Sequence, residues 1–170
     1  MISRMSQMTA LGADWWNDSG VPSELSAAFG LVQLDKLDEN LARRQRSFAI
    51  TSSHLAKYPH LFVLPQLTEG IETGWHMFPF IIQPDSGIRR ADLQQWMESH
   101  GVDTRMVWTG NITRQPMLRG QEFRVPSDGL PNADRVMEWG LIVPNNHSLS
   151  DDDCNYIGEC IAGFVAEKGL

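Results

Sequence analysis

The chain has 170 residues and a formal net charge of -7, with 42% hydrophobic and 21% charged residues. That length suits one globular domain with a core of ordinary size. The acidic balance argues against nucleic acid or an anionic membrane surface as the main partner, and no apolar run is long enough to span a bilayer.

The N-terminal tail, residues 1–22, is polar apart from the adjacent pair Trp15 and Trp16. A tryptophan pair in such a segment indicates packing, either on this domain or on a partner. A simple hydrophobic staple that closes the following helix is an equal alternative. The tail has no basic stretch followed by an apolar run, so we expect no secretory signal.

The sequence then predicts one long helix over residues 23–57. Ser23 is a good N-cap, and Gly30 is the only helix-breaking residue before Pro59. Four apolar residues recur at heptad spacing on an otherwise charged surface, namely Leu34, Leu41, Phe48 and Leu55. This pattern favours a helix packed along one side of a domain over a coiled coil, because the repeat is short.

Residues 58–170 alternate short strands and helices. We predict strands over 60–64, 74–82, 105–108 and 140–143, and helices over 88–100, over 131–137 and from Ser150 to near the C-terminus. Pro79 inside the second strand favours an edge position or a bulge. The order of elements predicts a two-layer α/β or α+β domain. Of these we expect an α+β fold, a two-layer α/β sandwich with a small, mostly antiparallel sheet. Residues 23–170 thus form one small domain after the tail.

The segment 103–116 holds the most suggestive polar residues. Its strand-like start breaks at Gly110-Asn111, and two arginines and two amides flank that break: Arg105, Arg114, Asn111 and Gln115. Arginine forks and amides commonly hold a phosphate or a polyhydroxylated ligand. The alternative is a strand end whose arginines pair with surface carboxylates.

Other candidate chemistry is weaker. The five histidines include no i, i+4 pair, so we expect no zinc site, and Asp151–Asp153 suit a helix N-terminus. Cys154 and Cys160 fall on one helix and point apart, which favours packing roles and a reducing cytoplasm. The three lysines, Lys36, Lys57 and Lys168, have no apolar setting suited to Schiff-base chemistry.

Several ordered motifs resemble the C-terminal part of the DegT-type family. This family comprises pyridoxal-phosphate (PLP)-dependent sugar aminotransferases and related dehydratases of keto-deoxy nucleotide sugars. Residues 26–37 resemble its "AA-x-GL-x-QL-x-KL" helix, 75–82 its "W-x-x-FPI" strand, and 110–116 the "GN-x-TRQP" of the dehydratase-like branch. Residues 90–105 and 131–147 resemble "R-x-x-L … GI-x-TR" and "NAD-x-x-M … LP". The resemblance covers about residues 23–168.

The resemblance implies the small domain of a fold-type I PLP enzyme, with helices on one face of its sheet. Arg105, Asn111, Arg114 and Gln115 would then face a nucleotide sugar or a partner surface, with His147 on a neighbouring loop. Trp75 would belong to the core. No segment resembles the one that carries the Schiff-base lysine, and the family's "GYN" segment is replaced at residues 17–22. We therefore expect no PLP in this chain, although full-length relatives use it.

Our leading hypothesis is a stand-alone small domain without aminotransferase activity of its own. It would act as a binding or assembly module, or as half of a split enzyme whose large domain is a separate chain. We expect a homodimer formed through the long helix and the Trp15-Trp16 tail. The alternative is a PLP-independent enzyme that uses Arg105, Arg114 and His147 on a nucleotide sugar. A structural remnant without a ligand is the third reading.

Overall fold

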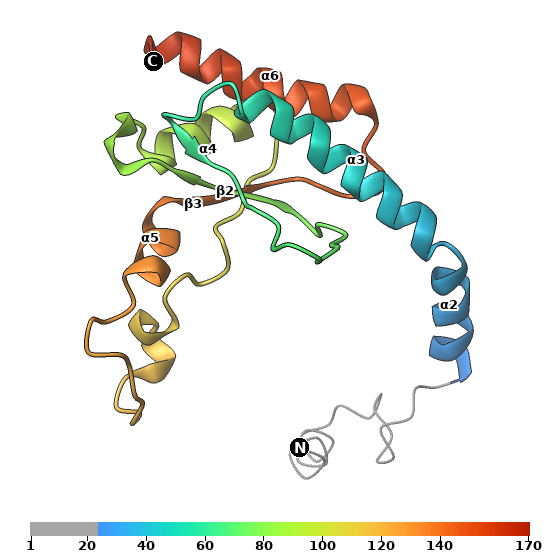
Figure 1. The fold of residues 1–170 in the computed structure, drawn as a ribbon, viewed down its shortest axis with the longest axis horizontal. Coiled ribbons are helices and arrows are strands. Elements are labelled where there is room, and N and C mark those ends of the chain that lie inside the picture. Colours follow the sequence, from blue (N-terminus) through green and yellow to red (C-terminus); the bar gives the residue numbers. More distant parts are fainter. Residues whose placement is uncertain (1–23) are drawn as a thin grey trace. The chain divides into compact units, whose positions relative to one another are not determined.

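The structure, a computed structural model, describes residues 24–170, with side chains from residue 27 onward (Figure 1). The tail with Trp15 and Trp16 lies outside the described residues. The elements in chain order are α2 (Glu24–Asp35), α3 (Leu37–Leu55), β1 (Phe62–Val63), β2 (Phe78–Ile82), α4 (Arg90–Ser99), α5 (Pro131–Trp139), β3 (Gly140–Val143) and α6 (Asp151–Lys168). Short 3₁₀ turns cover Pro84–Ser86, Ile112–Arg114 and Pro116–Leu118.

The predicted helix over residues 23–57 is two helices, α2 and α3, which meet at Lys36. The backbone N–H of Lys36 donates to the carbonyl of Gln33 at 3.3 Å, a bond that spans three residues instead of four and tightens the turn. The chain separates into two compact units, residues 1–40 and 41–170. Within the first unit, α2 exposes apolar side chains around its circumference: Phe29, Leu31, Val32 and Leu34.

The second unit contains a three-stranded antiparallel sheet in the order β1-β2-β3. Phe62 pairs with Ile82, and Phe78 pairs with Val143. Phe78, Phe80 and Ile82 alternate toward the core and are each at most 2% exposed. The predicted α+β fold with an antiparallel sheet is confirmed.

Pro79 lies in the central strand, although the sequence favoured an edge. Two local features explain why a residue without an N–H is accepted there. On one side, Pro79 faces Ile142, whose backbone N–H and carbonyl both bond to Arg105 instead. On the other side, β1 ends at Val63, which pairs with Ile81, so the sheet stops before it reaches Pro79. The strand is therefore an edge at this residue.

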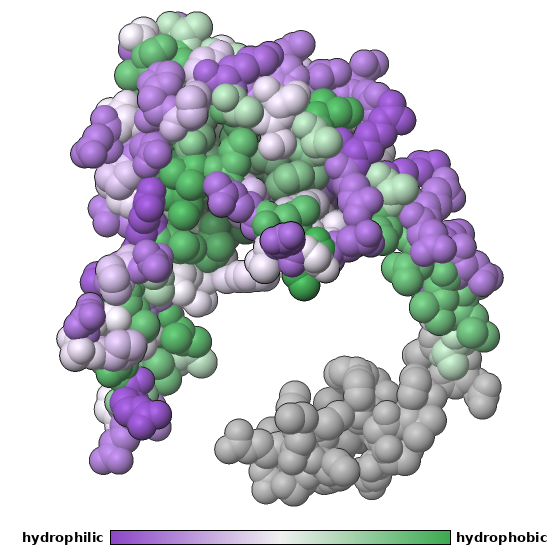
Figure 2. All heavy atoms as spheres, viewed as in Figure 1, coloured by the Kyte–Doolittle hydropathy of each residue, from purple (hydrophilic) through white to green (hydrophobic). Residues whose placement is uncertain are grey.

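Three helices cover one face of the sheet, as Figure 1 shows for α3, α4 and α6. The core between the layers draws on every one of these elements: Leu55 from α3, Leu93 and Met97 from α4, and Ile157, Ile161 and Phe164 from α6. The opposite face carries a shallow apolar hollow of about 160 Å³, whose lining includes Val63, Ile81, Val107 and Val136. Figure 2 shows apolar surface in this part of the molecule.

The predicted third strand, residues 105–108, is reduced to a single bridge. The Arg105 N–H donates to the Ile142 carbonyl at 3.0 Å, and the Ile142 N–H donates back at 2.7 Å. Pairing cannot continue, because the backbone turns into the left-handed region at Trp108, with φ of 43°. The segment therefore leaves the sheet almost at once.

The C-terminal helix begins as predicted. The Ser150 hydroxyl accepts from the Asp153 N–H, and the Asp153 carboxylate accepts from the Ser150 N–H, which completes a capping box. Cys154 and Cys160 are buried free thiols on this helix, as the packing interpretation requires. Burial raises the pKa of the Cys154 thiol, so it stays protonated at neutral pH. Among residues 24–170, no helix is long and apolar enough to cross a membrane.

Candidate functional site

The turn over residues 110–115 is folded tightly against α5. Gly110 adopts φ of 60°, and a Cβ at this position would lie 2.3 Å from the Cβ of Met137. Only glycine avoids both the strain and the clash. The Asn111 side chain then caps the 3₁₀ turn, because its Oδ1 accepts from the Thr113 N–H at 3.0 Å and the Thr113 hydroxyl at 2.6 Å.

Asp134, in the first turn of α5, anchors this turn. Its Oδ1 accepts from Asn111 Nδ2 at 2.6 Å, and its Oδ2 accepts from an Arg114 guanidinium N–H at 2.7 Å. Asn111 is 3% exposed, and both ends of its amide are occupied. The amide of Gln115 donates to the Thr109 carbonyl at 2.8 Å, which closes the turn from the other side.

The structure therefore brings Asn111, Arg114 and Gln115 together but gives them structural partners. Asn111 is buried and uses three of its four hydrogen-bonding sites within the turn, so it has little left to offer a ligand. The Arg114 side chain is 61% exposed, and one guanidinium nitrogen is engaged with Asp134, which leaves further N–H groups open to solvent. Of the three residues, Arg114 has the greatest capacity for an external anion.

Arg105 stands at the single bridge beside β3, and its side chain is exposed. Its guanidinium forms no ion pair with any of the described residues. It shares the 105–115 segment with Arg114, but no contact joins the two side chains within the described part of the chain.

His147 belongs to a second cluster, beyond the other end of β3. The Asp134 anchor precedes β3 in the chain, whereas the loop of His147 follows it and packs on α3, where Ser47 Oγ donates to the Asn146 carbonyl at 3.4 Å. The structure does not bring His147 together with Arg114. The alternative of an enzyme that uses both on one substrate therefore receives no support from this geometry.

The second cluster contains residues that sequence reasoning missed. Asn145 is 2% exposed, and its Nδ2 donates to the carbonyls of Trp75 at 2.6 Å and Arg44 at 3.4 Å. Three buried polar atoms here have no hydrogen-bond partner among the described residues: Asn145 Oδ1, Arg44 Nε and His147 Nδ1. The consecutive asparagines after Pro144 were the available signal, because two amides after a buried strand indicate a loop tied down by side chains.

Trp75, which the resemblance placed in the core, is only half-buried. Its ring stacks on Phe48 with centroids 4.1 Å apart, and its backbone has a left-handed φ of 34°. Trp75 and Phe48 form part of the wall of an open groove of about 420 Å³ between α3 and the loop after β1, together with Gln45, Leu67, Ile71 and Glu72.

The residues present do not fit PLP. The whole sequence holds three lysines, and Lys36, Lys57 and Lys168 are all exposed on helices or at a helix end. The Lys168 ammonium lies 5.7 Å from the Phe164 ring on α6, far along the chain from the 110–115 turn. A Schiff-base lysine needs a desolvated or electropositive setting, which none of these three has. No catalytic step through PLP can be assigned to these residues.

Comparison with known proteins places this geometry in context. Residues 21–162 match the model of the DegT/DnrJ/EryC1/StrS aminotransferase family. The chain is 33% identical over 146 residues to dTDP-4-dehydro-2,6-dideoxy-D-glucose 3-dehydratase of Saccharopolyspora spinosa, and the match covers 86% of this chain and 31% of that protein. It is 27% identical over 135 residues to lipopolysaccharide biosynthesis protein RfbH of Salmonella typhimurium, covering 79% of this chain and 31% of that protein.

A solved structure agrees in fold. The E. coli GDP-4-keto-6-deoxy-D-mannose-3-dehydratase with bound hydrated PLP superposes with a TM-score of 0.73 at 29% identity, over 82% of this chain and 35% of that one. The chain spans about a third of the length of the curated relatives that it matches. The family match covers most of the chain, and it agrees with the motifs and with the fold. The chain belongs to the DegT/DnrJ/EryC1/StrS aminotransferase family.

Proposed function

We propose that these residues act as the small-domain part of a system that processes nucleotide sugars, as a binding or assembly module without aminotransferase turnover of its own. The 110–115 turn presents Arg114 to an anionic, sugar-bearing ligand or to the surface of a partner chain. In a split-enzyme arrangement, a large domain outside these residues would supply PLP.

The observation that carries the proposal is the fixed position of Arg114. One guanidinium nitrogen of Arg114 donates to Asp134 Oδ2, and the buried amide of Asn111 donates to Oδ1 of the same carboxylate. An arginine that is already oriented loses less conformational freedom when it binds a phosphate. Arg105 and Gln115, in the same segment, would add a second cation and a further amide.

The ligand class is supported by the relatives. Two proteins similar to this chain are named for dTDP-linked and GDP-linked keto sugars. Both ligands combine a diphosphate with a polyhydroxylated ring, which arginine forks and amide groups recognise. The lack of a suitable lysine supports the part of the proposal that assigns no turnover to this chain.

Calorimetric titration of the 170-residue protein with GDP-mannose and dTDP-glucose tests the binding proposal. We expect Arg114→Ala to weaken binding about tenfold, the loss of one charge-assisted contact. Arg89→Ala is the matched control, because Arg89 is also an exposed arginine in an Asp pair, with Asp92 at 2.6 Å, but it lies at the start of α4. If the wild-type protein binds neither nucleotide sugar, or if both variants lose binding equally, the ligand proposal fails.

We also propose a homodimer through the long-helix region. Phe29, Leu31 and Leu34 of α2 are between 64% and 70% exposed, an unusual amount of apolar surface for one helix. Sedimentation at rising protein concentration should show a dimer that Leu34→Glu dissociates. A wild-type protein that sediments as a monomer throughout contradicts this proposal.

A further inference from the structure

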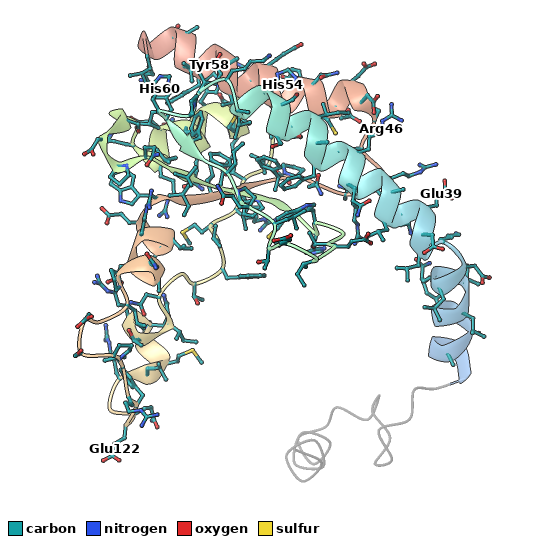
Figure 3. All side chains as sticks on the ribbon, in the orientation of Figure 1. Glu39, Arg46, His54, Tyr58, His60 and Glu122 are labelled. Carbon is teal, nitrogen blue, oxygen red and sulfur yellow. The ribbon has the colours of Figure 1, made fainter. Side chains whose placement is uncertain are left out.

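The segment of residues 105–125, called the arm below, differs in charge from the rest of the chain. It contains four arginines and one glutamate, so its net charge is +3. The whole chain carries -7, so the other 149 residues together carry -10. Figure 1 shows the arm descending from the sheet beside α5, and Figure 3 places its only acidic residue, Glu122, at the far tip.

The arm also exposes apolar side chains between its arginines. Six large apolar residues of the arm are at least 42% exposed: Met106, Trp108, Ile112, Met117, Phe123 and Val125. Arg105, Arg119 and Arg124 are exposed and have no ion pair among the described residues. Tryptophan, methionine, phenylalanine and arginine are the side chains most enriched at protein interfaces.

The base of the arm is held by local contacts. Trp108 is 76% exposed while its backbone is held at φ of 43°, and the next turn is fixed by Gly110 against Met137 and by Asn111 on Asp134. A non-glycine residue kept in the left-handed region costs about 1–3 kcal/mol and often marks a functional segment. The fold therefore maintains a strained turn that presents an indole ring to solvent.

A complementary surface lies on α6 of the same chain. This helix contains five acidic residues and one lysine, and Asp152, Glu159 and Glu167 are exposed along it. Tyr156, between the first two, is 48% exposed. At the far end of α6, an open groove of about 330 Å³ against α4 is lined by Trp96 and Phe164, together with the charged residues Asp92, Glu167 and Lys168.

The cations near this surface are few. Arg89 is paired with Asp92 beside the groove, and Lys168 lies over the Phe164 ring. Arg46 is paired with Asp151 at the start of α6, on the side of α3. In the middle of the helix, Glu159 has no ion-pair partner among the described residues.

We propose that the arm of one copy docks on the solvent face of α6 and the adjoining α4–α6 groove of a second copy. The arm supplies arginines and an aromatic side chain, and the α6 surface supplies carboxylates and an aromatic-lined groove. The charges favour a second copy as the binding partner. The arm has a net charge of +3, and the remaining residues of the same chain have a net charge of -10. Figure 1 places arm and α6 on opposite sides of the domain, so the contact is head-to-tail.

This contact differs from a dimer through α2 and stands or fails separately. It also differs from nucleotide binding at Arg114. The apolar side chains are spread along twenty residues of the arm, more than a single base or sugar ring can cover. A polypeptide surface matches that extent.

Photo-crosslinking of the full chain tests the contact directly. Phe123 is replaced by p-benzoylphenylalanine, and equal amounts of ¹⁴N- and ¹⁵N-labelled protein are mixed and irradiated. We expect mixed-isotope crosslinks from position 123 to peptides of α6 or of residues 90–99. Crosslinks within one chain only, crosslinks to other peptides, or no crosslinks would overturn the proposal. The proposal would also fail if adding GDP-mannose abolished all mixed-isotope crosslinks from position 123, because the arm would then bind the nucleotide.

A charge exchange gives a second, quantitative test. Arg119→Glu with Arg124→Glu reverses the arm, and Glu159→Lys with Glu167→Lys reverses α6. Each pair should raise the dissociation constant of the association at least about tenfold, and all four substitutions in one chain should restore it. Lys57→Glu, at an exposed position near the end of α3, is the control and should have little effect. Association that survives both reversed pairs but is lost in Leu34→Glu would assign it to α2 and refute the arm contact.

Discussion

The side-chain amide of Asn111 donates to the Asp134 carboxylate at 2.6 Å, while Arg114 bonds to the second oxygen of that carboxylate at 2.7 Å. One acidic residue of α5 thus holds two residues of a turn that precedes it by about twenty positions. The polar residues that look like ligand contacts in the sequence first serve to build the turn. Any binding role of Arg114 depends on this support.

Asn111→Ala should lower the free energy of unfolding by about 1–3 kcal/mol, because it removes a buried side chain and leaves the half-buried polar groups of Thr113 and Asp134 without this partner. Arg114→Ala should cost less than about 1 kcal/mol, because the Arg114–Asp134 pair is largely exposed. Urea denaturation followed by circular dichroism measures both. Equal effects of the two substitutions would show that the turn is not anchored as described.

Gly110→Ala and Gly120→Ala separate backbone strain from steric clash. Both glycines have left-handed φ, 60° and 76°, so each alanine should cost about 1 kcal/mol from conformation alone. Gly120 has nothing within 4 Å of its added Cβ, whereas the Cβ at Gly110 would lie 2.3 Å from Met137 Cβ and 2.4 Å from its Cα. The unfolding free energy of Gly110→Ala should therefore fall considerably further.

The clash at Gly110 involves the backbone of α5, which allows a sharper check. Met137→Ala keeps the Cβ and Cα atoms that clash with the added methyl group, so it should not restore the stability lost in Gly110→Ala. Recovery of stability in the double variant would mean that the contact involves only the flexible end of the methionine side chain.

The sequence predicted the elements whose signals are local. The capping box at Ser150 and Asp153, the helix α4 and the strands β2 and β3 were all visible as spacing and composition. The break at Lys36 was not, because it depends on one backbone bond to Gln33 and on no helix-breaking residue. The prediction of a third strand over residues 105–108 was wrong for a similar reason. The backbone is left-handed at Trp108, and tryptophan is not a residue type that favours this conformation.

The candidate site was predictable in part. The motif from Gly110 to Gln115 predicted a turn where the structure has one, but its partner Asp134 belongs to another element and has no signature near the motif. Asn145 was missed because its importance comes from burial and from two backbone carbonyls distant in sequence, Trp75 and Arg44. Residue types show which groups can bind, whereas the fold decides which of them are already occupied.

The capping box predicts a pH dependence. Hydrogen bonds from the Ser150 hydroxyl and backbone lower the pKa of the Asp153 carboxyl below its usual value of 3.8. The folded state therefore favours the ionised form, so this contribution is present above the unfolded pKa and is lost as pH falls through the folded pKa. Thermal unfolding between pH 2 and pH 7 should show a smaller acid-induced loss of stability in Asp153→Asn than in the wild type. An identical pH profile would contradict the assignment.

The tie between Asn145 and Trp75 predicts a second and opposite dependence. Asn145 Nδ2 faces two carbonyl oxygens, so Asn145→Asp places an acceptor against acceptors in a buried position. Only the protonated carboxyl can donate to Trp75, so burial and the carbonyls should raise the pKa of the new group in the folded state. Its stability contribution is then present below the unfolded pKa and is lost as pH rises through the folded one. At pH 7 we expect a loss of at least about 2 kcal/mol relative to the wild type, smaller at pH 4.

Asn146→Asp is the matched control for this prediction. Asn146 is exposed, and its Oδ1 accepts from the Ser148 N–H at 2.8 Å, a role that a carboxylate fills equally well. Its effect should stay within about 0.5 kcal/mol at both pH values. Near-ultraviolet circular dichroism reports on the Trp75–Phe48 stack in the same samples, because the Trp75 carbonyl loses its donor. If Asn145→Asp proves as harmless as Asn146→Asp, then the buried amide does not hold Trp75 in place.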